Sequence, residues 1–223
     1  MENKDLKERL LQICCDGGSL AELLTREELE ALPENPDWEI RSLTAEILAC
    51  DPNGARGEAL LCRLSEDSDD LVRVQAVDSL SAYDSPAAYR VMVRALADRN
   101  ELVRCYGAYG VGAVGKSQSP EEAAERLRQL LRKEASLHVQ AACWEGLYLL
   151  GHEDALERLM ELFPRGDFQL RCYLLNGLKE FLNPRNAGRI LKFVSGLDSY
   201  AGESGQELAE MCRTVLARTP ELG

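Results

Sequence analysis

Five short segments with a shared pattern recur along the chain at intervals of 32, 31, 36 and 31 residues. Each starts with Asp, Asn or Ser, has an aliphatic residue fourth, and in four of the five has Arg fifth. The segments lie at 37–41, 69–73, 100–104, 136–140 and 167–171. Asp, Asn and Ser are preferred helix N-caps, and a Leu or Val seven places after the fifth position shares a helical face with the aliphatic residue. A helix repeated at this period predicts a repeat architecture.

Further helix-like segments separate these five. They are predicted at 19–32, 54–65, 85–98, 119–134, 152–163 and 184–197, with flanking helices at 3–15 and 203–218. Pro86, Pro120 and Pro184 stand near the starts of three of them, where proline is tolerated. Ser119 and Glu122 have the spacing of a capping box. The repeating unit is therefore helix, turn, helix.

Stacked units of this kind predict an all-α, right-handed solenoid of about six helical pairs. We expect one continuous domain over 1–223. Residues 1–18 are expected to form an N-terminal cap, 19–182 five repeats, and 183–223 a C-terminal capping pair.

The pattern Asp-x-x-Val-Arg-x-x-Ala-x-x-x-Leu resembles HEAT repeats, particularly the short bacterial type called PBS-lyase HEAT-like repeats. The resemblance covers roughly residues 25–182. It implies a hydrogen-bonded ladder between adjacent repeats, formed by the N-cap Asp and the Arg. The matching residues are Asp37, Asp69, Asp167, Arg41, Arg73, Arg104 and Arg171. Ser136 and Gln140 depart from the pattern, so we expect a weakened ladder in the fourth copy.

The formal charge is −12, and its distribution is uneven. Residues 1–70 hold 18 acidic and 7 basic side chains, so nearly all the excess negative charge lies in the first third. Such a surface disfavours nucleic acid and anionic lipid and favours basic partners. No apolar run reaches the roughly 18 residues that span a bilayer, and the first residues lack a secretory hydrophobic region. A cytoplasmic location is expected.

Eight cysteines are scattered along the helical segments. They are Cys14, Cys15, Cys50, Cys62, Cys105, Cys143, Cys172 and Cys212. No pair has the CxxC spacing of a zinc or redox site, and the two histidines, His138 and His152, lack spaced ligand partners. We expect reduced, buried thiols that pack as small hydrophobes, and neither metal nor cofactor.

One segment is a literal match to the phosphate-binding pattern GxxxxGK[ST]. It runs from Gly110 through Gly115 and Lys116 to Ser117. A phosphate loop requires a preceding strand, whereas the residues before this segment follow the helical repeat. Gly115 and Gly151 each lie eleven places after the fifth repeat position, which predicts helix C-caps. Close helix packing, or a soft point in the stack, explains the glycines better, and nucleotide binding stays as an alternative.

Without a catalytic constellation, we expect a non-enzymatic module that binds a protein or peptide. Outward positions of the Arg-bearing helices, which line the concave side of HEAT-like solenoids, carry acids and tyrosines. The candidate binding residues are Glu46, Asp78, Tyr106, Tyr109, Glu145, Tyr148 and Tyr173. Such a surface favours a basic partner segment, as in an inhibitor or immunity-type protein. Chromophore lyases share the repeat type, so a lyase-like subunit is a second alternative.

Overall fold

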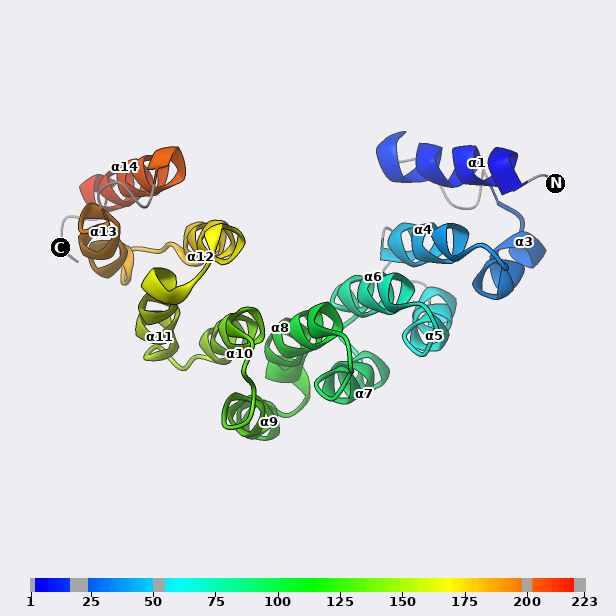
Figure 1. Ribbon diagram of the computed structural model, residues 1–223, viewed down its shortest axis with the longest axis horizontal. Helices are drawn as coiled ribbons and strands as arrows, with labels where there is room; N and C mark the ends of the chain where they lie inside the picture. Colours follow the sequence, from blue (N-terminus) through cyan, green and yellow to red (C-terminus); the bar gives the residue numbers. More distant parts are fainter. Residues whose placement is uncertain (1–2, 17–23, 50–54, 198–201, 219–223) are drawn as a thin grey trace. The chain divides into compact units, whose positions relative to one another are not determined.

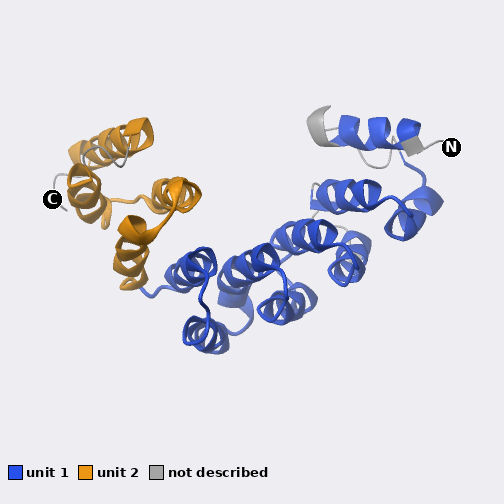
Figure 2. Ribbon diagram, in the orientation of Figure 1, with its two compact units in different colours: residues 1–152 blue, residues 153–223 orange. Residues whose placement is uncertain are grey.

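The computed structural model describes residues 3–16, 24–49, 55–197 and 202–218, and in these ranges every regular element is a helix (Figure 1). The chain divides into two compact units, residues 1–152 and 153–223 (Figure 2). The sequence analysis placed no boundary at this point. Each unit is described by itself below.

The first unit contains α1 to α10. Its elements are α1 (Asn3–Asp16), α3 (Arg26–Ala31), η1 (Leu32–Glu34), α4 (Trp38–Ala49), α5 (Ala55–Leu64), α6 (Asp70–Leu80), α7 (Pro86–Ala95), α8 (Glu101–Gln118), α9 (Pro120–Leu131) and α10 (Leu137–Leu149). α4 packs on α6, α6 on α8, and α8 on α10, so the Arg-bearing helices make one row (Figure 1). α5, α7 and α9 make the other row, and each packs against the helix that follows it.

The repeat register predicted from the sequence is confirmed. All five predicted N-cap residues accept hydrogen bonds from amides of their own first turn. The aliphatic residue before the Arg or Gln position is buried in every copy, as is the later Leu or Val. Burying such a side chain stabilises the fold by about 1.5–3 kcal/mol. The helices therefore bury the face that the pattern indicated.

Two predicted helix starts are wrong in detail. Ser119 makes no side-chain cap at the start of α9, although Pro120 occupies the first turn as expected. A capping box is present at another helix, where Thr25 and Glu28 form it at the start of α3. Pro184 lies in a turn because the next helix begins only at Ala187.

α1 joins the first unit through an apolar cluster with α4. Leu6, Leu10 and Ile13 of α1 are buried with Ile40 and Ile47 of α4. An ion pair lies beside this contact, because the Lys7 ammonium is 2.7 Å from an Asp37 carboxylate oxygen. Cys14, Cys15 and Cys50 fall outside the residues whose side chains are described.

α8 and α10 approach each other at glycine. A Cβ atom built on Gly112 would lie 2.2 Å from the Gly146 Cα and 2.5 Å from its carbonyl oxygen. A Cβ on Gly146 would lie 2.7 Å from the Ala108 carbonyl oxygen. Two backbones can come this close only where no side chain intervenes. Close helix packing, expected from the sequence, is the reason for these glycines.

The second unit contains α11 (Ala155–Leu162), η2 (Phe163–Arg165), α12 (Phe168–Phe181), α13 (Ala187–Ser195) and α14 (Gly202–Arg218). α14 packs on both α12 and α13. Phe163 is buried and meets the Phe193 ring edge to face, with centroids 5.7 Å apart. The Arg171 guanidinium lies 5.7 Å from the centroid of the same Phe163 ring. Aromatic and cationic contacts thus join η2, α12 and α13.

Candidate functional site

Two tyrosines of α8 form the centre of the candidate binding surface. Tyr106 and Tyr109 are 37% and 38% exposed. Asp78 lies on the neighbouring helix α6 and is half-buried. Burial raises the pKa of Tyr106, and the negative charge of Asp78 raises it further. Asp78 and Tyr106 therefore lie on adjacent helices and interact electrostatically, while their shared role in binding a partner stays a prediction.

The outer members of the predicted set lie on other helices. Glu46 is exposed on α4, and Tyr148 is partly exposed on α10. Tyr173 is 38% exposed on α12, which belongs to the second unit. A stripe that joins Tyr173 to the α6 and α8 residues therefore stays a prediction.

Glu145 is a correction. The helical spacing predicted an outward side chain, yet Glu145 is only 3% exposed. It precedes Gly146, where α8 and α10 are in backbone contact, so the neighbouring helix covers this position. Its negative charge helps to raise the pKa of Cys105 on α8.

The arginines of the repeat form a ladder, but its acceptors differ from those the resemblance implied. Arg41 binds Asp67 through Nε and Nη2 at 2.7 and 2.9 Å. Arg73 binds Asp98 in the same bidentate way at 3.0 and 2.9 Å. Arg104 binds Glu134 at 2.8 and 3.2 Å. Each acid stands two residues before the next N-cap, so the ladder uses these acids in place of the cap residues.

The cap residues Asp37, Asp69 and Asp167 instead accept bonds from amides at the starts of their own helices. Of the other matching residues, Arg171 donates to the carbonyl oxygens of Phe163 and Pro164. Gln140, which replaces Arg in the fourth copy, donates to the Glu134 carbonyl oxygen at 2.8 Å.

Each ladder acid also accepts a bond from the amide of the cap residue that follows it. These amides are those of Asp69, Asn100 and Ser136. Burial raises the pKa of Asp98, but the Arg73 guanidinium and the Asn100 amide outweigh burial and lower the pKa overall. The ladder acids are therefore held ionised, and each carboxylate is used in bonds to an Arg and to a cap amide.

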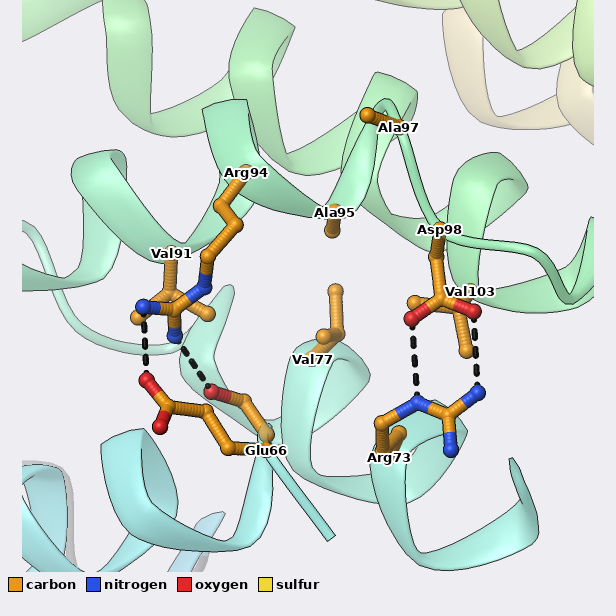
Figure 3. Close-up of a pocket in the computed structure, with 10 residues that line it drawn as sticks. Glu66, Arg73, Val77, Val91, Arg94, Ala95, Ala97, Asp98 and Val103 are labelled. Carbon is orange, nitrogen blue, oxygen red and sulfur yellow. Dashed lines mark hydrogen bonds and ion pairs between the residues drawn. The ribbon is translucent and has the colours of Figure 1, made fainter. Parts of the chain in front are cut away.

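The cavity beside the ladder, between neighbouring repeats, is bracketed by two sets of charged contacts (Figure 3). It encloses about 310 Å³. The Arg73–Asp98 pair closes one side, and Arg94, which binds Glu66 at 2.7 Å and the Ser65 hydroxyl at 3.0 Å, closes the other. Buried valine and alanine side chains line it between these contacts. The charged side chains around this cavity already bind one another. Their role is therefore to join neighbouring repeats rather than to act as an acid or a base.

The GxxxxGK[ST] match is not a loop. α8 is a continuous helix from Glu101 to Gln118, so Gly110, Gly115, Lys116 and Ser117 are all helical. The amides of a phosphate loop cannot converge on an anion when they are bonded within a helix. The predicted C-cap at Gly115 is wrong for the same reason, and its place is taken by Ser119. At the end of α10 the glycine has the expected terminating role, because Gly151 directly follows the C-cap Leu150 and has a φ of +95°.

The cysteines and histidines are the remaining candidates for catalytic or metal-binding residues. The five described cysteines are free, and burial raises the pKa of Cys105 to about 12, with Glu101 adding to the effect. His138 lies 3.5 Å from a Glu101 oxygen, and His152 lies 3.3 Å from Arg128. Across the described ranges, no group of three or more His, Cys, Asp or Glu residues is arranged to hold a metal ion. Within the same ranges, every helix is too short or too polar to cross a membrane.

The sequence analysis missed two sets of residues. The ladder acids could have been found, because an acid precedes the cap by two places in three copies. Exposed apolar side chains at the starts of the Arg-bearing helices were also missed. They are Trp38, Leu71, Leu102 and Phe168, which are 40%, 50%, 49% and 80% exposed. In the sequence, these side chains can be recognised as an apolar residue one or two places after the cap.

Comparisons with known proteins agree with this geometry. The family model for HEAT repeats matches residues 26–109. Twenty-one chains of solved structures match, among them one from the complex of CpcE and CpcF of phycocyanin lyase from Nostoc sp. PCC7120. That chain is 16% identical with a TM-score of 0.50, and the match covers 91% of this chain and 97% of that chain.

An engineered protein is 15% identical with a TM-score of 0.45, over 95% of this chain and 68% of that chain. No curated protein matches. At 16% identity the likeness to the lyase chain shows the fold, an all-α solenoid.

Proposed function

Because residues 26–109 match the family model for HEAT repeats, we propose that this chain is a non-catalytic scaffold that binds a basic protein segment on its α6–α8 face. We define this face by Asp78, Tyr106 and Tyr109. The observation that carries the proposal is the pair of exposed tyrosines on α8, with Asp78 on the adjacent helix α6 acting electrostatically on Tyr106. HEAT repeats present extended surfaces to partners, which supports protein binding in general.

The chemistry of the face favours a cationic segment. Tyrosine offers a large apolar ring and a polar tip and loses little conformational entropy on binding. Asp78 supplies a negative charge that is partly withdrawn from water, where attraction to Lys or Arg is stronger. The excess of acidic residues in the first 70 residues steers basic molecules toward this part of the chain. An inhibitor or immunity-type role is one concrete form of this function.

The test uses a fluorescent Lys/Arg-rich peptide and an acidic peptide of equal length, with binding followed by anisotropy. We expect the wild type to bind the basic peptide and the double variant Tyr106→Ala/Tyr109→Ala to bind it about tenfold or more weakly, because buried aromatic anchors each contribute more than about 1 kcal/mol. Asp78→Asn should mainly slow association, and its effect should shrink at high salt.

Phe168→Ala is the matched control, because Phe168 is an exposed aromatic side chain outside the face. Circular dichroism confirms that each variant is folded. If the tyrosine double variant binds as the wild type does, or if the acidic peptide binds equally well, the proposed face is refuted.

The likeness to a phycocyanin lyase chain supports a second candidate, a lyase-like subunit. Its probe is phycocyanin, mixed with the protein and analysed by size-exclusion chromatography. Co-elution with phycocyanin that the tyrosine double variant leaves intact would favour this candidate over the basic-segment scaffold.

A further inference from the structure

Asp78 of α6 is a half-buried acid to which no cation and no hydrogen-bond donor is bound within the described part of the chain. Burial alone raises the pKa of its carboxyl group, because no bond or neighbouring positive charge offsets the loss of hydration. Part of the residue still meets solvent, so a group from a partner can reach it. A carboxylate in this state gains more from a cation than a fully hydrated one does.

Other acids of the first unit that are withdrawn from water are bound by arginine. The ladder acids Asp67, Asp98 and Glu134 each accept two bonds, from Nε and Nη2 of one guanidinium. Arg73 is the one basic residue of α6, and it is bound in this ladder. Asp78 therefore lacks the arginine that the ladder acids have.

The starts of α6 and α8 lie side by side, which sets Asp78 against the tyrosines of α8. Asn100, the cap of α8, donates to an Asp70 carboxylate oxygen at the start of α6, at 3.2 Å. Asp78 and Tyr109 each lie nine residues after the cap of their own helix, and Tyr106 lies one turn earlier. Because α6 packs against α8, the carboxylate and the two rings belong to one patch of surface (Figure 1).

A carboxylate beside exposed aromatic rings matches a guanidinium better than an ammonium. The guanidinium is planar, so it stacks on an aromatic ring while it donates two parallel bonds to a carboxylate. It is also more weakly hydrated than an ammonium, so it loses less when it meets a half-buried acid. A lysine ammonium is a strongly hydrated point charge that cannot make the paired bonds.

We propose that the α6–α8 face binds an arginine side chain of the partner, with the guanidinium bonded to Asp78 and stacked on the ring of Tyr106. The partner thus supplies to Asp78 what Arg41, Arg73 and Arg104 supply to the ladder acids within the chain. This inference rests on the function proposed above and names the residue that the basic segment must present. A lysine at the same place binds the face more weakly.

The test compares two fluorescent peptides of equal length and equal charge, in which every basic residue is Arg in one and Lys in the other. Binding to the full chain is followed by anisotropy. We expect the wild type to bind the Arg peptide about tenfold more tightly than the Lys peptide. Tyr106→Leu should reduce this ratio to about threefold or less, because leucine keeps apolar area but offers no flat ring. Asp78→Asn should also reduce it, because asparagine has one acceptor oxygen and no charge.

Phe168→Leu is the matched control, since it makes the same change from aromatic to leucine at an exposed side chain outside the face. It should keep the wild-type ratio. Equal binding of both peptides by the wild type would overturn the inference and leave the proposed function standing. A ratio that Tyr106→Leu or Asp78→Asn leaves unchanged, or that Phe168→Leu lowers equally, would overturn it as well. If neither peptide binds, the proposed function fails and this inference fails with it.

Discussion

Replacing Gly112 by Ala tests whether the backbone contact between α8 and α10 holds the first unit together. The new Cβ would lie 2.2 Å from the Gly146 Cα, whereas ordinary contact begins near 3.4 Å. The two helices must therefore separate locally by roughly 1.2 Å, because backbone atoms cannot rotate away as a side chain can. A gap of about 1 Å costs the lining atoms a quarter to a half of their dispersion energy.

The expected change in unfolding free energy combines two effects. Overpacking typically costs about 1–3 kcal/mol, and the upper end applies here because the clash is with backbone. Ala in a helix interior is favoured over Gly by about 1 kcal/mol. The net expectation is a loss of about 2 kcal/mol, which for a urea dependence of about 2 kcal/mol per molar lowers the midpoint by about 1 M.

Urea unfolding followed by circular dichroism and by the fluorescence of Trp144, which lies on α10, measures this change. Gly188→Ala is the matched control, because a Cβ on this helical glycine of α13 meets nothing within 4 Å. That variant should be as stable as the wild type or up to about 1 kcal/mol more stable. A Gly112→Ala protein with an unchanged or higher midpoint would show that the helices can separate without loss, and the reasoning would be wrong.

Two further predictions concern the ladder and its surroundings. Asp98→Ala leaves the guanidinium of Arg73, which is 6% exposed, without its bidentate acceptor, so we expect the unfolding free energy measured in urea to fall by about 3 kcal/mol. The surface variant Glu122→Ala should change the unfolding free energy little, and equal effects of the two variants would contradict the prediction. Hydrogen bonds from Asn100, Arg73 and Arg99 lower the folded pKa of Asp70 to about 2, so its stabilisation is present above the unfolded pKa of about 3.9 and is lost as pH falls through 2. Thermal midpoints at about pH 5 and about pH 2.5 should therefore differ less in Asp70→Asn than in the wild type, and an equal pH dependence would refute this linkage.

The features that the sequence predicted well are those that depend on a few neighbouring residues. N-caps such as Asp69 and Asn100 bond to amides two or three places ahead, so their signal is complete within the segment itself. The left-handed glycine that ends α10, Gly151, is local in the same way. The buried face followed from helical periodicity, which is also a short-range property.

The features that it missed depend on contacts between helices. Glu145 has an outward spacing on its own helix, and only the close approach of α8 to α10 buries it. Gly115 is eleven places after Arg104, as Gly151 is after Gln140, yet α8 continues past it to Gln118.

The two roles of each ladder acid have a consequence for how such a chain can change length. Asp67, Asp98 and Glu134 each hold the preceding repeat through Arg and fix the start of the next helix through the cap amide. The acid stands two residues before the cap in all three, although the intervals between caps range from 31 to 36 residues. The number of residues between one cap and the next ladder acid can therefore vary, whereas the two-residue spacing from that acid to its own cap is fixed. A whole repeat added or removed between a ladder acid and its cap would leave the spacing in the neighbouring repeats intact. A single residue inserted there would break both the bond to Arg and the bond to the cap amide.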